Sequence, residues 1–274
     1  MNGQLHADIH LGANLQTAFQ PALTYSGGRL DFLGFDDGTR ARPRRQPGQS
    51  DLDYYRSFPN IWSTTSGGGS PNYGLSFSVG GSKELRGRRL GYLAALTYGA
   101  EAQTRFEEVR TFYLDADAEH RPVLRPNIEY DNGRFGDGTP RQSWRSTSSV
   151  SWAALTSLSL QAAPGHRISL NGLFTQSSDD EARVYEGYNS GTDREVRYLR
   201  LRFIARSMLL AQLSGSSLLR SRLGDGVLDW NLTYALAARN EPDTREIAYQ
   251  RGTEGGAFRL ANSGTSGQRF YSQN

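Results

Sequence analysis

The sequence predicts an all-β protein in which roughly eight to ten antiparallel strands form part of a transmembrane β-barrel. Three observations favour this class. Apolar and polar residues alternate with period two, the alternating segments run for about ten residues, and no apolar stretch has the length of a membrane helix. Because successive side chains of a strand point to opposite faces, each segment has one apolar and one polar face. A barrel wall between lipid and water needs this pattern.

The alternation defines the expected strands. In the first of them, Leu5 and Ile9 fall on one face, whereas His6 and Asp8 fall on the other. The clearest hairpin joins two apolar stripes through a compact turn at 163–166. In chain order, the alternating segments are 5–16, 73–80, 90–98, 150–160, 168–174, 199–213 and 228–236.

The connections between these segments differ in length, and the whole chain, 1–274, is expected to be one partial barrel domain. Short connections are expected at 162–167 and 215–226, and a further strand near 245–250. Outer-membrane barrels have short periplasmic turns and longer extracellular loops, so the two short connections are expected to face the periplasm. A long irregular connection is expected near 36–71, and long outer loops near 114–143, 177–195 and 239–274.

The composition agrees with a membrane barrel. Hydrophobic residues make up 36% of the 274 residues, and the mean hydropathy is −0.61. A barrel wall needs apolar side chains on only half of its positions, so this low hydropathy is compatible with membrane insertion. The 14 Tyr, 12 Phe and 4 Trp residues argue against disorder for most of the chain.

Charge and cysteine content exclude several classes. The net charge is +3, and nearly all the positive charge is arginine, because Lys83 is the only lysine. A nucleic-acid surface more often mixes Lys and Arg in clusters, so we expect no nucleic-acid partner and attribute the arginines to codon bias. The absence of cysteine excludes disulfides, a thiol nucleophile and a Cys-ligated zinc site.

A soluble β-sandwich or meander is the structural alternative, because it also alternates one buried face with one exposed face. Sandwich strands usually have about five or six residues. The stripes here run for about ten residues, which suits a tilted membrane crossing better.

Two groups of residues are candidates for ligand contact. Tyr185, Glu186 and Tyr188 lie in an expected outer loop, where exposed aromatic side chains can anchor a ligand or simply pack the loop.

Arg200, Arg202 and Arg206 lie on the polar face of one strand and are expected to face the barrel lumen. There they could attract an anionic solute or pair with an acidic internal domain. The alternative is that a water-filled lumen tolerates any charge.

Enzyme motifs are missing from the sequence. It has no Gly-x-Ser-x-Gly elbow, P-loop or dinucleotide fingerprint. On a strand, His6 and His10 are about 13 Å apart, too far to share one ion. The acidic clusters at 36–38 and 179–181 lack the spacing of a calcium loop. The sequence therefore predicts no enzyme activity, no metal and no cofactor.

Three stretches resemble a known family. Residues 27–40 (GGRLDFLGFDDGTR), 168–187 and 228–249 resemble passages in the barrel of TonB-dependent outer-membrane receptors. Their order and spacing agree along most of the chain.

This resemblance implies a barrel of about 22 antiparallel strands around an N-terminal plug. It also implies a place in the bacterial outer membrane and uptake of a scarce siderophore, vitamin or glycan. The implied partners are outer-membrane lipid, the plug of the same protein, a small nutrient ligand and the TonB complex, which supplies energy through a box at the receptor's N-terminus.

The chain also departs from the family pattern. We recognise no signal peptide, TonB box or plug in it, and its last residues lack the final aromatic strand. It is therefore expected to be a fragment that covers the N-terminal part of the barrel. Two alternatives remain, a passive structural or adhesion barrel and an outer-membrane enzyme barrel. The enzyme would need His120 or His166, which are expected on opposite sides of the membrane.

Overall fold

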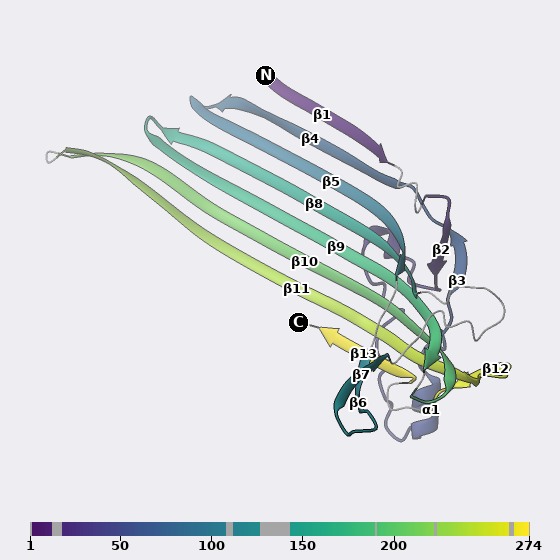
Figure 1. Ribbon diagram of the computed structural model, residues 1–274. Coiled ribbons are helices and arrows are strands. Elements are labelled where there is room, and N and C mark those ends of the chain that lie inside the picture. Colours follow the sequence, from purple (N-terminus) through teal and green to yellow (C-terminus); the bar gives the residue numbers. More distant parts are fainter. Residues whose placement is uncertain are drawn as a thin grey trace.

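The computed structural model describes residues 2–12, 18–107, 112–126, 143–189, 191–221, 224–262 and 266–273. Its main feature is a nine-stranded antiparallel sheet, which confirms the all-β prediction (Figure 1). In the described residues, the strand order is β1-β4-β5-β8-β9-β10-β11-β12, β13 also pairs with β11, and the sheet does not close into a barrel.

The strands of this sheet are β1 (Asn2–Gly12), β4 (Asn72–Leu85), β5 (Arg88–Glu107), β8 (Ser143–Ala163), β9 (His166–Asn189), β10 (Arg194–Ser221), β11 (Gly224–Gly252), β12 (Gly255–Leu260) and β13 (Gln268–Gln273). Two small sheets are β2 (Pro21–Thr24) with β3 (Thr65–Gly68), and β6 (Phe112–Ala116) with β7 (Pro122–Pro126). The described helices are the 3₁₀ turn η1 (Asp31–Leu33) and α1 (Asp51–Arg56).

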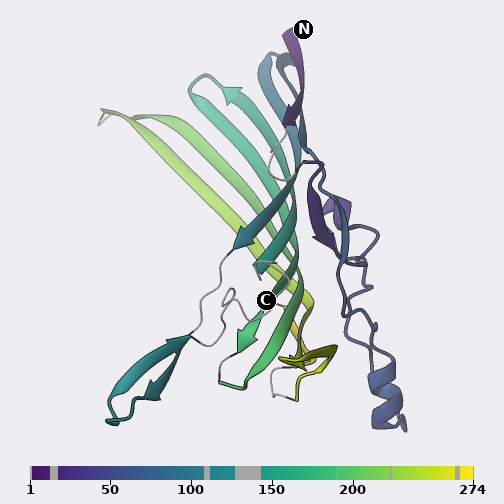
Figure 2. The ribbon, with the colours of Figure 1, turned by 45° about the vertical axis from the view of Figure 1, so that its right-hand side comes forward.

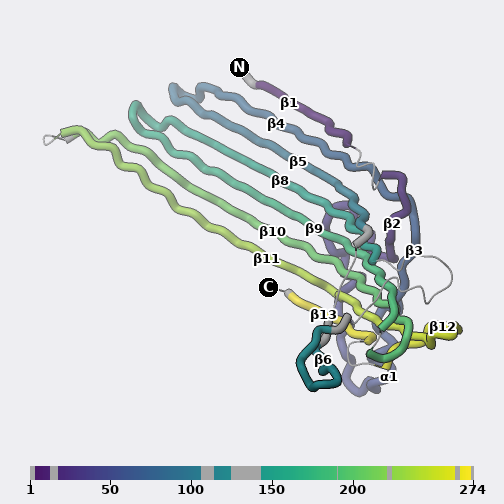
Figure 3. The backbone as a smooth tube through the Cα atoms, viewed as in Figure 1, coloured from purple at the N-terminus to yellow at the C-terminus, as the bar shows by residue number. Residues whose placement is uncertain are grey.

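The hairpins β4–β5, β8–β9 and β10–β11 turn at the same end of the sheet, at the upper left of Figures 1 and 3. Between β4 and β5, Arg86 and Gly87 both have positive φ (52° and 74°), as a two-residue hairpin turn requires. Between β8 and β9, Pro164 and Gly165 (φ 80°) form the compact turn expected at 162–167. We call this end of the sheet the hairpin end.

Several expected connections are strands instead. Residues 215–221 and 224–226 continue β10 and β11, so the connection expected at 215–226 is much shorter. The same holds for 177–195, most of which extends β9 and begins β10. The prediction was wrong because polar residues suggested a loop, whereas their charges are paired across neighbouring strands.

The other long connections are also more structured than expected. Within 239–274, β11 continues to Gly252, so the strand expected near 245–250 is its end, and β12 and β13 follow. A hairpin of β6 and β7 takes up 112–126, while the rest of the loop expected at 114–143 lies largely outside the described residues. The connection at 36–71 is mostly irregular, as expected, apart from α1 and β3.

The strand register divides the sheet into two faces. Tyr98, Trp152 and Gln176 are directly paired neighbours and therefore share one face. Following this register toward the hairpin end gives an almost continuous set of apolar rows, which we call the apolar face. It carries Leu5, Ile9, Leu75, Phe77, Leu90, Leu96, Leu158, Leu170, Phe174, Leu209, Leu213, Leu232 and Leu236. The opposite, polar face is rich in Ser, Thr, Asn and, away from the hairpins, charged residues.

A row of three aromatic side chains, on β4, β5 and β8, lies where the apolar rows end. The ring centroids of Tyr73 and Tyr98 are 5.9 Å apart, and those of Tyr98 and Trp152 are 4.7 Å apart. Beyond this row, the apolar face is covered by residues 18–71, which run along one side of the sheet (Figure 2).

Side chains of the sheet hold this covering segment by its backbone. The Tyr98 hydroxyl donates to the Phe32 carbonyl (2.7 Å), and Trp152 Nε1 donates to the Leu33 carbonyl (2.8 Å). Gln176 Nε2 donates to the next carbonyl, at position 34, over 2.7 Å. Gly34 has φ 76°, and a Cβ there would lie 3.1 Å from a serine hydroxyl of β9, so glycine allows this close approach.

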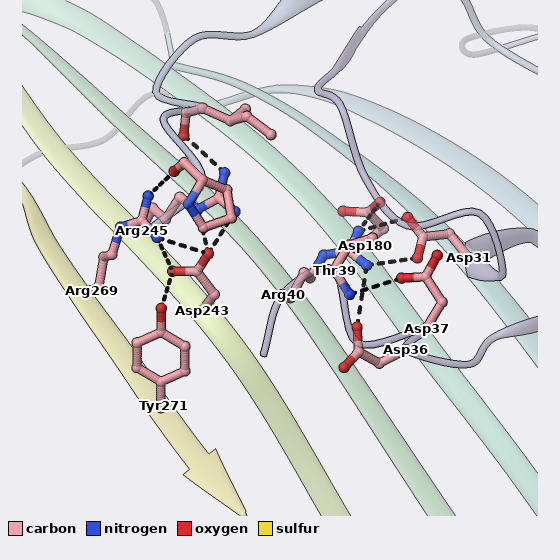
Figure 4. A network of polar contacts seen from close by, with 12 residues as sticks. Asp31, Asp36, Asp37, Thr39, Arg40, Asp180, Asp243, Arg245, Arg269 and Tyr271 are labelled. Carbon is pink, nitrogen blue, oxygen red and sulfur yellow. Dashed lines mark hydrogen bonds and ion pairs between the residues drawn. The ribbon is translucent and has the colours of Figure 1, made fainter. Parts of the chain in front are cut away.

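Arg40 is the most deeply enclosed charge of the segment. Its guanidinium is 3% exposed and makes two hydrogen bonds to Asp31, of 2.7 and 2.6 Å (Figure 4). Asp180 on β9 lies 3.6 Å away, and the Phe203 ring lies 4.3 Å from the guanidinium carbon. Burial raises the pKa of Asp180, which stands beyond the apolar rows, despite its attraction to Arg40. The bond to Asp31 holds Arg40 within the segment, and Arg40 links the segment to the sheet through its stacking on Phe203 and its proximity to Asp180.

We expect Asp31→Asn to lower the free energy of unfolding by about 3 kcal/mol or more, because it leaves a buried guanidinium without its bidentate carboxylate. Asp180→Asn is the matched control within the same cluster. It removes a 3.6 Å contact and a carboxylate that burial already disfavours, and the amide oxygen can still accept the hydrogen bond of Tyr25, so its effect should stay within about 1 kcal/mol. Urea unfolding followed by tryptophan fluorescence measures both, and equal losses would contradict this account.

Candidate functional site

The polar face holds a cleft of about 470 Å³ away from the hairpin end. Strands β5, β8, β9 and β10 line it with charged and hydroxyl side chains. The charged ones are Glu101, Arg105, Arg145, Asp179, Glu181, Arg202 and Arg206. Because both signs of charge are present, the lining suits a polar ligand with several hydrogen-bonding groups better than a simple anion.

Arg200, Arg202 and Arg206 lie on this polar face, opposite the apolar rows, as the alternation predicted. Each is paired with a carboxylate of a neighbouring strand. Arg200 contacts Glu181 at 2.6 Å, Arg202 contacts Glu241 at 2.7 Å, and Arg206 contacts Asp179 at 2.9 Å. The first and last of these acids are on β9, and Glu241 is on β11.

These pairs give the cleft a fixed charge pattern. Although burial acts in the opposite direction, hydrogen bonds from Arg202 and Arg239 hold the pKa of Glu241 below its usual value. The sequence pattern missed the acidic partners because Asp179 and Glu181 were assigned to a loop. Their alternate positions, facing alternate arginines on the next strand, were the signal that could have revealed them.

Tyr185, Glu186 and Tyr188 do not lie in a loop, so that part of the prediction was wrong. They belong to the end of β9. Tyr185 stacks on Tyr198 of β10, with centroids 4.6 Å apart and an interplanar angle of 17°. Ligand contact by these residues stays a prediction.

Glu186 and Tyr188 make local contacts. Glu186 accepts a 2.6 Å hydrogen bond from Arg197, and the Tyr188 hydroxyl donates to Asp193 over 2.6 Å. These contacts and the stacking of Tyr185 join β9 to β10 near the connection between them. They stabilise the part of the two strands that lies beyond the aromatic row.

A larger pocket, of about 920 Å³, lies where residues 42–62 meet β13. Its described lining combines aromatic rings with arginines: Arg42, Tyr54, Phe58, Trp62, Arg269 and Tyr271. The Arg269 guanidinium carbon lies 5.3 Å from the centre of the Phe58 ring and 4.9 Å from that of the Trp62 ring. Rings and cations of this kind can hold an anionic or cyclic ligand group.

Asp243 organises the floor of this aromatic pocket (Figure 4). Its fully buried carboxylate accepts hydrogen bonds from Arg245 (2.8 and 2.5 Å), from Arg269 (3.2 Å) and from the Tyr271 hydroxyl (3.1 Å). Arg245 also donates to the Ile61 carbonyl at 2.8 Å. Asp243 has φ 55° and sits where the register of β11 shifts, so a β-bulge directs its side chain to this network.

The acidic clusters considered for calcium are occupied by protein cations. Asp36 and Asp180 lie beside Arg40, and Asp179 binds Arg206. Among the described residues, no group of three or more His, Cys, Asp or Glu side chains is arranged to hold a metal ion.

The two histidines considered for an enzyme site, His120 and His166, are far apart. His120 lies in the β6–β7 hairpin, and His166 begins β9 at the hairpin end, so the two histidines lie toward opposite ends of the sheet (Figure 1). No helix in the described part of the chain is long and apolar enough to cross a membrane.

Comparison with known proteins gave no match, either to family models, to curated proteins or to solved structures. Function is therefore inferred from the geometry above and from the sequence resemblance.

We expect Asp243→Asn to lower the free energy of unfolding by about 3 kcal/mol or more, because it leaves two arginines without their buried carboxylate. Asparagine tolerates positive φ, so the backbone of the bulge should persist. Asp229→Asn, at an exposed position of the same strand, should change stability by less than about 0.5 kcal/mol. Denaturant titration compares the two variants. A small effect of Asp243→Asn would show that the network does not hold the pocket.

Proposed function

We propose that this chain is part of the barrel wall of a TonB-dependent outer-membrane receptor, which takes up a scarce nutrient by an energy-coupled mechanism. The observation that carries this proposal is the division of the sheet. Next to the hairpin end, one face is apolar across seven neighbouring strands and the other is largely polar, and the hairpins β4–β5 and β8–β9 turn at this same end. The sequence resemblance supplies the family.

The exposure of the apolar face supports lipid as its neighbour. Ile9 is 82% exposed, Leu232 68% and Leu170 47%, although they stand in continuous apolar rows. A soluble sandwich would bury such rows under a second sheet. A continuous exposed apolar surface suits a membrane instead.

Strand length supports a position half inside the bilayer. A tilted strand crosses the hydrocarbon core with about 9–11 residues. Strands β8 to β11 have 21 to 29 residues, so only the half next to the hairpin end is needed. The aromatic row of Tyr73, Tyr98 and Trp152 then forms the outer interfacial belt. Beyond it, residues 18–71 cover the apolar face outside the bilayer.

The polar face would then line the lumen. Arg200, Arg202 and Arg206, with their acidic partners, would present a charged surface to the plug and to a siderophore, vitamin or glycan entering from outside. The TonB complex would displace the plug of the same protein and release the ligand inward. These moving parts come from the resemblance.

The open edges of the sheet support a larger barrel. Within the described residues, β1 pairs only with β4, and residues 224–239 of β11 pair only with β10. Unpaired strand edges cannot be left in hydrocarbon, so further strands are needed to close the wall.

The first test places the two faces. The chain contains no cysteine, so a fluorophore can be attached to Leu170→Cys on the apolar face and to Asn171→Cys on the polar face. After reconstitution in bilayers that contain nitroxide-labelled lipids, we expect strong quenching at position 170 and weak quenching at 171, because neighbouring side chains point to opposite faces. Equal quenching at the two positions would argue against a lipid-facing wall.

The second test concerns the family. DNA sequencing on both sides of the reading frame should show a plug-length coding region upstream and more alternating strands, ending in an aromatic residue, downstream. Flanks without related coding sequence would contradict the receptor assignment and favour a small barrel or a soluble β protein.

A further inference from the structure

The turn from Leu30 to Phe35 exposes apolar side chains at an unusual place. Leu30 is 39% exposed, Phe32 61% and Phe35 38%. Two of the residues between them face the protein: Asp31 binds buried Arg40, and Gly34 is packed against β9. The turn therefore separates its polar anchors from its apolar side chains, as an amphipathic element does.

This turn lies directly on the aromatic row. Three consecutive carbonyls, those of Phe32, Leu33 and Gly34, accept hydrogen bonds from side chains at this row. The exposed side chains thus stand on the apolar face at the level where the apolar rows end.

The turn also satisfies its own backbone. Leu33 N donates to the Leu30 carbonyl (2.9 Å), Gly34 N to the Asp31 carbonyl (2.9 Å) and Phe35 N to the Leu30 carbonyl (3.2 Å). Partial removal from water would therefore break none of these hydrogen bonds, and backbone polar groups are the main cost of moving an irregular segment toward a bilayer.

We infer that Leu30, Phe32 and Phe35 form a lipid anchor that enters the interfacial region of the outer leaflet. This inference rests on the proposed function, because it requires the apolar face to meet lipid. Lipid is the occupant that the structure favours, since the anchor continues the exposed apolar rows at their outer boundary. Burying phenylalanine side chains in the interface removes apolar surface from water, while Asp31 and Arg40 stay paired inside the protein.

Its test uses three single-cysteine variants, each with the same fluorophore, in bilayers with nitroxide groups at the head-group level or deep in the acyl chains. Phe32→Cys probes the anchor. Leu170→Cys is the lipid-facing control, and Arg44→Cys is the exposed control on the same covering segment. We expect the label at position 32 to lose fluorescence mainly to the shallow nitroxide, the label at 170 mainly to the deep one, and the label at 44 little to either.

The outcomes separate the two proposals. Quenching at 170 without quenching at 32 would overturn the lipid anchor and leave the membrane wall in place. Absence of quenching at 170 would overturn the membrane wall and the anchor together.

A second measurement uses Phe32→Glu, which should keep the backbone bonds of the turn but reduce the retention of the turn at the bilayer. We expect faster protease cleavage of residues 18–71 in lipid and unchanged cleavage in detergent.

Discussion

Seven neighbouring strands, from β1 to β11, form six antiparallel pairs, and the register of these pairs is the constraint from which the other features follow. Directly paired residues share a face, so the position of one side chain in this ladder determines the face of its neighbours across the sheet. Between β9 and β10, whose pairing is unbroken, a shift of one residue would move apolar side chains such as Leu209 to the polar face and arginines such as Arg202 to the apolar face. The aromatic row and the charged cleft exist because this register persists across strands that are far apart in the chain.

Two buried clusters of arginine and aspartate join the covering segment to that sheet. One surrounds Arg40, near the middle of the segment, and the other surrounds Asp243 of β11, whose arginine partners bond the carbonyls of Pro59 and Ile61. Both place a cation against carboxylates in surroundings with little water, where the loss of one partner is costly. The hydrogen bonds to the carbonyls at 32–34 complete the attachment. The segment is thus fixed at several separate places, although it contains little regular secondary structure.

The sequence pattern was sufficient where structure depends on local alternation and turn chemistry. It located the β8–β9 hairpin and the face of Arg200, Arg202 and Arg206. It was insufficient where a strand contains many charges, because Asp179 and Glu181 resemble loop residues until the arginines of β10 are brought beside them. The aromatic pocket was not predictable either, since it joins residues 42–62 to residues 267–271 through the positive φ of Asp243. Such pairings depend on contacts between distant parts of the chain.

The two-residue turns also bear on the order of folding. Each joins strands that are adjacent in sequence, so the hairpins β4–β5 and β8–β9 close short loops with a small loss of chain entropy. The covering segment meets its partners only across long separations, 119 residues from Leu33 to Trp152 and 210 from Pro59 to Arg269. Local contacts form before distant ones when closure entropy is limiting. Assembly would thus proceed by hairpins first, with residues 18–71 docking onto a sheet that already exists.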